Sequence, residues 1–335
     1  MIDATVGGVQ AERSSGAALT AGGSKTTLGI AAVVALALAM IYLFGNKSDA
    51  MVTQSIVTGL LLGGIYALVS LGLTLIFGVL GIVNFAQGAM LAMAMYLVYF
   101  MVSAAGINAY IAVVLAVPVM FAFGWLVQAV LLNRLTVSGG HERPLLVTLG
   151  LSLLITNVIL MTFDGRPLGV AAPVGGTIQL FGAVVDISRL IALGGALLMA
   201  AVLGFILKKS SLGLAIRAVS SNAVGAALVG VNVQRIYAMT FGLGSASVAV
   251  AGGLMAPFTS LIPTAGEQFT TLAFVIVVLG GLGSVPGALL GGLVIGLVQT
   301  VGSMYLPGSG SLLLVFVVFI LVLFLRPQGL FGAKQ

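Results

Sequence analysis

The sequence predicts an all-α, polytopic membrane protein with about ten transmembrane helices. Of its 335 residues, 60% are hydrophobic and only 6% are charged, and the mean hydropathy is +1.27. This composition leaves too little polar surface to cover a soluble globule of that size. The chain also contains 47 glycines, which suit close packing between helices in lipid. Ten of its thirteen Lys and Arg residues fall on one side of the predicted membrane.

The helices are predicted from apolar runs that can cross a hydrocarbon core of about 30 Å at about 1.5 Å per residue. The run at 269–281 is short, and the region 54–104 is interrupted by Gly and Asn. Half-helices or re-entrant segments are therefore expected in both regions. The runs are 28–44, 54–79, 87–104, 109–132, 144–163, 188–207, 236–259, 269–281, 285–304 and 310–325.

The basic residues predict the orientation, with both termini in the cytoplasm. An even number of spans puts the termini on one side, and the Lys/Arg bias of cytoplasmic loops says which side it is. Only Lys47, Arg166 and Arg189 then lie outside, together with the acids Asp49, Asp164, Asp186 and Glu267. The cytoplasmic basic residues are Arg13, Lys25, Arg134, Arg143, Lys208, Lys209, Arg217, Arg235, Arg326 and Lys334.

The first fifty residues differ from the rest. Residues 1–27 are rich in Gly, Ala, Ser and Thr without an apolar period, which predicts a disordered cytoplasmic tail. The run 28–44 follows Lys25 as a signal peptide would, but it lies late, and 46–49 is no small-residue cleavage site. We therefore expect 28–50 to be a retained, appended transmembrane helix with its linker. Residues 51–335 then form the main membrane domain.

Several function classes are disfavoured by what the sequence lacks. No Asp, Glu, Lys, Arg or His is predicted well inside a span, whereas ion-coupled transporters usually hold such groups there. The Gly22–Thr26 segment has the letters of a phosphate-binding loop in the wrong spacing. His141 is the one histidine and cysteine is absent. We therefore predict no catalytic residue, no metal site and no cofactor in this chain.

The net positive charge is interpreted as belonging to loops that lie beside the membrane surface. Although the pI is about 9.8, the basic residues are dispersed between apolar runs and accompany no aromatic stacking motif. Cytoplasmic loops beside anionic lipid explain this pattern, so membrane lipid is an expected partner and nucleic acid is not.

A short sequence pattern occurs twice, each time at a predicted helix junction. Val79-Leu80-Gly81, six residues and then Gly88-Ala-Met-Leu return 199 residues later as Val278-Leu-Gly280, six residues and then Gly287-Ala-Leu-Leu. Either a duplicated half of the chain or the compositional bias toward Gly, Ala and Leu explains this repeated pattern. Asn84 and Gln87 either cap backbone groups, which is the favoured interpretation, or line a polar path. The residues considered for a translocation path are Asn84, Gln87, Gly88, Gly280, Gly283 and Pro286.

The segment from Lys208 to Arg235 is the second positive feature. It contains four basic residues, no acid and a helix-forming stretch from 213 to 230. Its length exceeds what a simple connection needs. The segment is either a surface helix that obeys the positive-inside bias or a docking element for a cytoplasmic partner. Its apolar positions predict one loose amphipathic face, made of Leu214, Ile216, Val219, Val224 and Leu228.

Five motifs, in order along residues 51–332, resemble those of permease subunits of branched-chain amino acid ABC importers, the Liv type. They are Gly59-Leu-Leu-Leu-Gly-Gly-Ile-Tyr-Ala-Leu, Val83-Asn-Phe-Ala-Gln-Gly-Ala, Ser211-Leu-Gly-Leu-Ala-Ile-Arg-Ala-Val with Ala226-Ala-Leu-Val-Gly-Val-Asn, Val278-Leu-Gly-Gly-Leu-Gly-Ser-Val-Pro-Gly-Ala, and Leu325-Arg-Pro-Gln-Gly-Leu-Phe-Gly. Two features depart from the family pattern: residues 220–224 lack the usual acid, and the extension 1–50 is added.

The resemblance implies a nine-helix core and a loop that contacts an ATP-binding subunit. The loop residues are Ser211, Gly213, Arg217, Ala218, Ala227, Gly230 and Arg235. The implied partners are a second permease chain, as homo- or heterodimer, two cytoplasmic ATP-binding subunits and a periplasmic or lipid-anchored solute-binding protein. ATP and Mg would be bound by the ATP-binding subunits.

The function that the resemblance implies is import of branched-chain amino acids, or of related amides or urea, across the bacterial inner membrane. The chain itself would not be an enzyme. Two other functions remain: an ion-coupled secondary transporter or channel, which an acid at membrane depth would favour, and a structural membrane scaffold.

Overall fold

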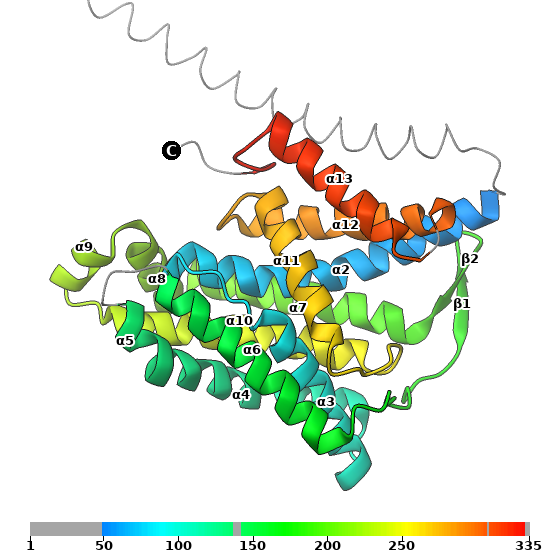
Figure 1. Cartoon of the computed structure of the whole chain (residues 1–335), viewed down its shortest axis with the longest axis horizontal. Coiled ribbons are helices and arrows are strands. Elements are labelled where there is room, and N and C mark those ends of the chain that lie inside the picture. The colour runs from blue at the N-terminus through cyan, green and yellow to red at the C-terminus, as the bar shows by residue number, and fades with distance from the viewer. Residues whose placement is uncertain (1–48, 137–141, 307, 332–335) are drawn as a thin grey trace, which may run out of the picture.

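The computed structural model describes residues 49–136, 142–306 and 308–331, which are mostly helical (Figure 1). Each of the nine apolar runs from residue 54 onward contains a helix, so the all-α fold class is confirmed. The run 28–44 lies outside the described residues. The apolar helices are α2 Asp49–Leu80, α3 Gln87–Ala105, α4 Ala109–Val127, α6 Glu142–Phe163, α7 Ile187–Lys209, α10 Val233–Met255, α11 Ala265–Gly280, α12 Val285–Tyr305 and α13 Gly310–Leu325.

The described residues provide seven helices long and apolar enough to cross a membrane, counting α4 with the turn that follows it. Helices α11 and α13 are shorter, at 16 residues each. Helix α2 has 32 residues and is about 48 Å long, so it extends beyond a hydrocarbon core of about 30 Å.

Helices α2 and α10 form the centre of the molecule. Both are buried along most of their length, whereas α6 and α7 expose most of their apolar surface. The central helices are surrounded by α3, α4, α7, α11 and α12 (Figure 1). Exposed Leu, Val and Phe on the outer helices face the surroundings, as expected for helices that contact lipid.

Small residues bring α2 and α12 into backbone contact, as expected for membrane helices. A Cβ atom built on Gly63 would lie 2.8 Å from the Cα of Leu293. One built on Gly292 would lie 2.5 Å from the Cα of Ala67. Larger side chains at these positions would therefore separate the two helices.

The two ends of the helix bundle differ. One end carries a β-hairpin, β1 Thr177–Leu180 and β2 Ala183–Asp186, which we call the hairpin end. The Gln54 side chain fixes β2 to α2, because it donates to and accepts from the backbone of Val184 at 2.8 Å each. The other end carries α8 Ser211–Ser221 and α9 Ala223–Leu228, and we call it the α8–α9 end. The π-helix η1 Gln128–Leu132 and α5 Asn133–Thr136 also lie there (Figure 1).

The chain re-enters the bundle between α2 and α3, in one of the two regions where a broken helix is expected. Residues 81–86 turn back from the end of α2, and Asn84 and Gln87 are fully buried. The Gln87 Nε2 donates to the carbonyl of Val69 in α2 at 3.2 Å. Helix α3 therefore begins beside the body of α2, well inside the bundle.

Candidate functional site

Two short helices form the surface of the α8–α9 end, and polar caps define their boundaries. Ser210 caps α8 by accepting from the Gly213 N–H at 3.0 Å, and Asn222 caps α9 by accepting from the Gly225 N–H at 2.8 Å. Asn232 caps α10 in the same way at Arg235. Such caps satisfy backbone donors that helix starts leave free. The segment 208–235 thus contains two short helices, each with a defined start.

The prediction that this segment has a single amphipathic face is wrong. Ile216 and Val219 are 3% and 2% exposed and pack inward. The helix breaks at Asn222, and the remaining apolar side chains of the two helices are exposed. We call these the apolar patch: Leu214 63%, Val224 73%, Leu228 83% and Val229 79% exposed.

Helix α8 is fixed to two membrane helices. A Cβ atom on Gly213 would lie 2.3 Å from the Ile206 carbonyl oxygen of α7. Gly213 therefore allows a close backbone approach to α7 of the same chain. The Arg217 guanidinium donates to the Leu207 carbonyl, and the Ser220 hydroxyl donates to the Gly78 carbonyl of α2. Motion of α8 is thereby linked to the ends of α7 and α2.

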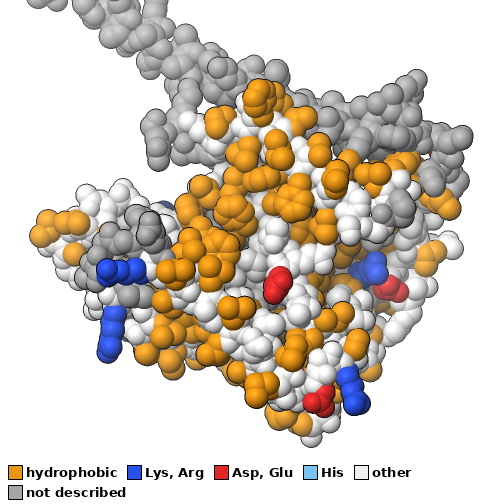
Figure 2. Space-filling model, viewed as in Figure 1, with side chains coloured by type: hydrophobic (Ala, Val, Ile, Leu, Met, Phe, Trp, Pro, Cys, Tyr) orange, Lys and Arg blue, Asp and Glu red, His pale blue; other side chains and the backbone are white. Residues whose placement is uncertain are grey.

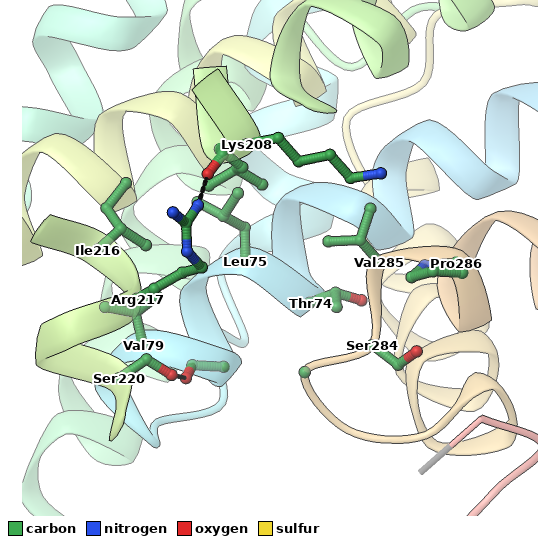
Figure 3. A pocket seen from close by; sticks show the side chains of 13 residues that line it. Thr74, Leu75, Val79, Lys208, Ile216, Arg217, Ser220, Ser284, Val285 and Pro286 are labelled. Atoms are coloured by element: carbon green, nitrogen blue, oxygen red, sulfur yellow. Dashed lines mark hydrogen bonds between the residues drawn. The ribbon is translucent and has the colours of Figure 1, made fainter. Parts of the chain in front are cut away.

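A pocket of about 340 Å³ lies behind α8. Figure 3 shows Arg217 and Ser220 of α8 on one side and Ser284, Val285 and Pro286 at the start of α12 on the other. Gly283 also lines it. The pocket thus brings part of the predicted coupling segment beside part of the predicted path.

The other residues of the coupling segment lie on the surface. Ser211, Ala218, Ala227, Gly230 and Arg235 are exposed. Gly230 has φ +88°, a conformation that favours glycine, with open space around it. Ser211, Gly230 and Arg235 line a crevice of about 450 Å³.

The remaining residues considered for a translocation path do not line the pocket behind α8. Asn84 Nδ2 donates to Gln87 Oε1 at 3.1 Å, and Asn84 Oδ1 accepts from the Ala86 N–H at 3.1 Å. Both side chains therefore stabilise the re-entrant turn. Gly280 packs against Gly287 of α12. Their role in translocation stays a prediction.

Gly88 joins two helix starts inside the bundle. A Cβ atom on Gly266 would lie 2.5 Å from the Gly88 carbonyl oxygen, so the backbones of α3 and α11 touch. The Gly88 N–H donates to Thr270 Oγ1 at 2.9 Å. Helix α11 therefore starts at the same level as α3.

This junction sets the position of Glu267 along the helix bundle. Val69, the partner of Gln87, lies eleven residues before the end of α2, or about 17 Å along its axis. Glu267 lies thirteen residues before the end of α11, or about 20 Å.

Basic residues mark the membrane boundary near both of those helix ends. Lys208 and Arg217 line the pocket beside Gly78, and the chain just after Arg326 bonds to Leu279, as the Leu330 N–H donates to its carbonyl at 2.8 Å. If these helix ends lie at one face of a hydrocarbon core of about 30 Å, Glu267 lies near the middle of that core. This location differs from the expectation that Glu267 lies outside the membrane.

The sequence contains a signal for this location of Glu267 that the prediction of transmembrane helices did not use. The apolar run of α11 is too short to cross the membrane, and the helix begins at Ala265, with Glu267 in its first turn. A short helix that ends at one surface must begin inside the membrane. In the described part of the chain, no three His, Asp or Glu side chains come together as a metal site would require.

These features agree with comparisons to known proteins. The family model described as "Branched-chain amino acid transport system / permease component" matches residues 55–323. The permease protein LivH of the high-affinity branched-chain amino acid transport system of Salmonella typhimurium is 31% identical over 299 residues, which cover 84% of this chain and 96% of LivH. The corresponding protein BraD of Pseudomonas aeruginosa is 29% identical over 296 residues, which cover 84% of this chain and 96% of BraD.

A more distant relative is the ribose import permease protein RbsC of Bacillus subtilis, 28% identical over 240 residues, which cover 69% of this chain and 71% of RbsC. No solved structure matches significantly. The chain belongs to the family of permease components of branched-chain amino acid transport systems. It is a multi-pass membrane permease component.

Proposed function

We propose that this chain is the permease subunit of an ATP-driven importer for branched-chain amino acids or related small solutes such as amides or urea. Its family and the names of LivH and BraD support this substrate class. Selectivity then lies largely in a periplasmic or lipid-anchored solute-binding protein. The importer resides in the bacterial inner membrane, with the α8–α9 end and both termini in the cytoplasm.

The observation that carries this proposal is the apolar patch on α8 and α9. Leu228 and Val229 are adjacent at the end of α9 and are 83% and 79% exposed. The next residue, Gly230, lines a crevice with Arg235. Exposed apolar side chains next to polar ones are typical of protein interfaces. Two cytoplasmic ATP-binding subunits, which bind ATP and Mg, would dock on this patch and on that of a second permease chain, identical or not.

The contacts of α8 support the coupling mechanism. ATP binding closes the ATP-binding subunits and moves α8, which bonds to α7 through Arg217 and to α2 through Ser220. Because α2 packs against α10, α11 and α12, a shift of its end changes the bundle, and access alternates between the two sides.

Charged substitutions on the patch test this docking. Leu228→Glu with Val229→Glu buries two unpaired acids in the interface and should lower copurification with the ATP-binding subunits at least about tenfold. Stimulation of ATP hydrolysis by loaded binding protein should be lost as well. Leu228→Met with Val229→Ile preserves the apolar surface and serves as the control. Full copurification and stimulation with the acidic pair would contradict the proposal.

One observation favours the ion-coupled alternative. Glu267 lies at membrane depth, where ion-coupled transporters place acids. That alternative predicts uptake by this chain alone, driven by an ion gradient. Family membership favours ATP-driven import, and the role of Glu267 then needs another explanation.

A further inference from the structure

Glu267 is an exposed acid on an otherwise largely apolar face. Figure 2 shows many hydrophobic side chains on this face and few acidic ones. The side chain lines a crevice of about 470 Å³ between α6, α11 and the re-entrant turn. Phe85, Leu149 and Phe274 form part of its apolar wall, and Ser152, Thr270 and Thr271 supply hydroxyls.

The hydroxyls of α11 are already engaged, whereas the carboxylate is not. Thr270 Oγ1 accepts from the Gly88 N–H and donates to the Gly266 carbonyl. Thr271 Oγ1 donates to the Glu267 backbone carbonyl at 3.1 Å. The ion pair between Arg189 and Asp186 does not involve Glu267. The Glu267 carboxylate therefore has its acceptor oxygens available at this crevice.

A carboxylate at this depth cannot face lipid at low cost. Charged side chains inside a membrane face a protein interior or water and pair with an opposite charge. The location of Glu267 in the first turn of α11 stabilises the helix through its dipole, but it does not remove the need for water or a cation. The exposed face of α11 must therefore border a polar space in the assembled transporter.

We propose that this crevice borders the translocation route and that Glu267 binds the ammonium group of an amino acid passing through it. This inference rests on the proposed import function and narrows its substrate class. An ammonium forms a charge-assisted hydrogen bond with a carboxylate, whereas urea and neutral amides form weaker ones. The apolar wall accommodates an aliphatic side chain, as small-solute sites do. The chain is thereby suited to zwitterionic amino acids over uncharged amides.

Thiol labelling tests whether water reaches this face. The chain is free of cysteine, so Glu267→Cys in the assembled complex reports one site. A water-soluble methanethiosulfonate should modify it at least about tenfold faster than Leu198→Cys, because thiolate forms only where water is present. Leu198 is 66% exposed midway along α7 and serves as the lipid-facing control. Equally slow modification at both positions would overturn the inference.

Uptake by the reconstituted complete importer tests the ammonium contact. Glu267→Gln should lower ATP-dependent amino-acid uptake at least about tenfold, the scale of one charge-assisted hydrogen bond. ATP hydrolysis stimulated by loaded binding protein should persist, so that solute moved per ATP falls. Glu267→Asp should restore most of the uptake. Gln268→Ala, at the exposed neighbour outside the crevice, should behave as wild type.

Failures of the two proposals give different results. If the wild-type complex imports amino acids with ATP and Glu267→Gln matches it, the inference fails while the proposed function stands. A parallel loss of uptake and hydrolysis would assign Glu267 a structural role and also overturn the inference. Absence of ATP-dependent uptake by the wild-type complex would instead reject the proposed function.

Discussion

At the scale of single residues, glycine controls how closely helix starts meet inside the membrane. Gly88 and Gly266 place the backbones of α3 and α11 in contact, and this contact sets the depth of Glu267. Glycine is required here because the space that a side chain would occupy is filled by a neighbouring backbone. The same reasoning applies to Gly213 between α8 and α7.

Gly88→Val should therefore destabilise the protein strongly. The new Cβ atom would lie 1.7 Å from the Gly266 carbonyl oxygen, and overpacking typically costs about 1–3 kcal/mol, with larger costs for severe clashes. Gly150→Ala is the matched control, because nothing lies within 4 Å of its added methyl group. In a helix this change should be neutral or stabilise by about 0.5 kcal/mol. Unfolding in detergent measures both, and equal stability of the two variants would refute this packing.

At the scale of elements, the described helices from α2 onward pack among themselves. Helix α2 begins at Asp49 and contacts α12, α10, α7 and α11. Residues 1–27 as a tail and 28–50 as an appended helix with linker remain a proposal, and the core at 51–335 is expected to be self-sufficient.

Deletion of residues 1–50 should leave a chain that inserts and assembles with its partners. The deletion removes only the first two residues of α2, and the basic residues at the α8–α9 end still orient the helices. Copurification with the ATP-binding subunits at normal expression is the measurement. Failure of the truncated chain to assemble would show that 28–44 packs within the transporter core.

The apolar helices were predictable from the sequence, whereas their depths were not. Apolar runs such as 285–304 predict transmembrane helices because their length is enough to cross the hydrocarbon core. The depth of α11 depends on the contact of Gly266 with Gly88, which joins segments far apart in the chain. The hairpin was missed because its strands have four residues each and pair only with one another. The break between α8 and α9 depends on the cap at Asn222, which apolar spacing does not reveal.

At the scale of the whole molecule, basic residues gather at the α8–α9 end. Lys208, Lys209, Arg217 and Arg235 lie in or beside α8 and α9, whereas Arg166 and Arg189 lie toward the hairpin. The Lys/Arg bias therefore predicts a cytoplasmic α8–α9 end.

Cysteine labelling on intact cells tests this orientation. Val229→Cys, at a position 79% exposed after α9, should be protected from an impermeant thiol reagent added outside. Phe181→Cys, at the hairpin turn where Phe181 is 87% exposed, should react. Permeabilised cells provide the control, since both sites should react there. Labelling of Val229→Cys in intact cells, with protection of Phe181→Cys, would invert the topology.

The central claim is that this chain moves solute only as part of an ATP-driven complex. The most direct measurement is uptake of a radiolabelled branched-chain amino acid into liposomes that contain either the complete importer or this chain alone. We expect uptake only by the complete importer, and only with ATP and loaded binding protein. Uptake by this chain alone, driven by a proton or sodium gradient, would contradict it.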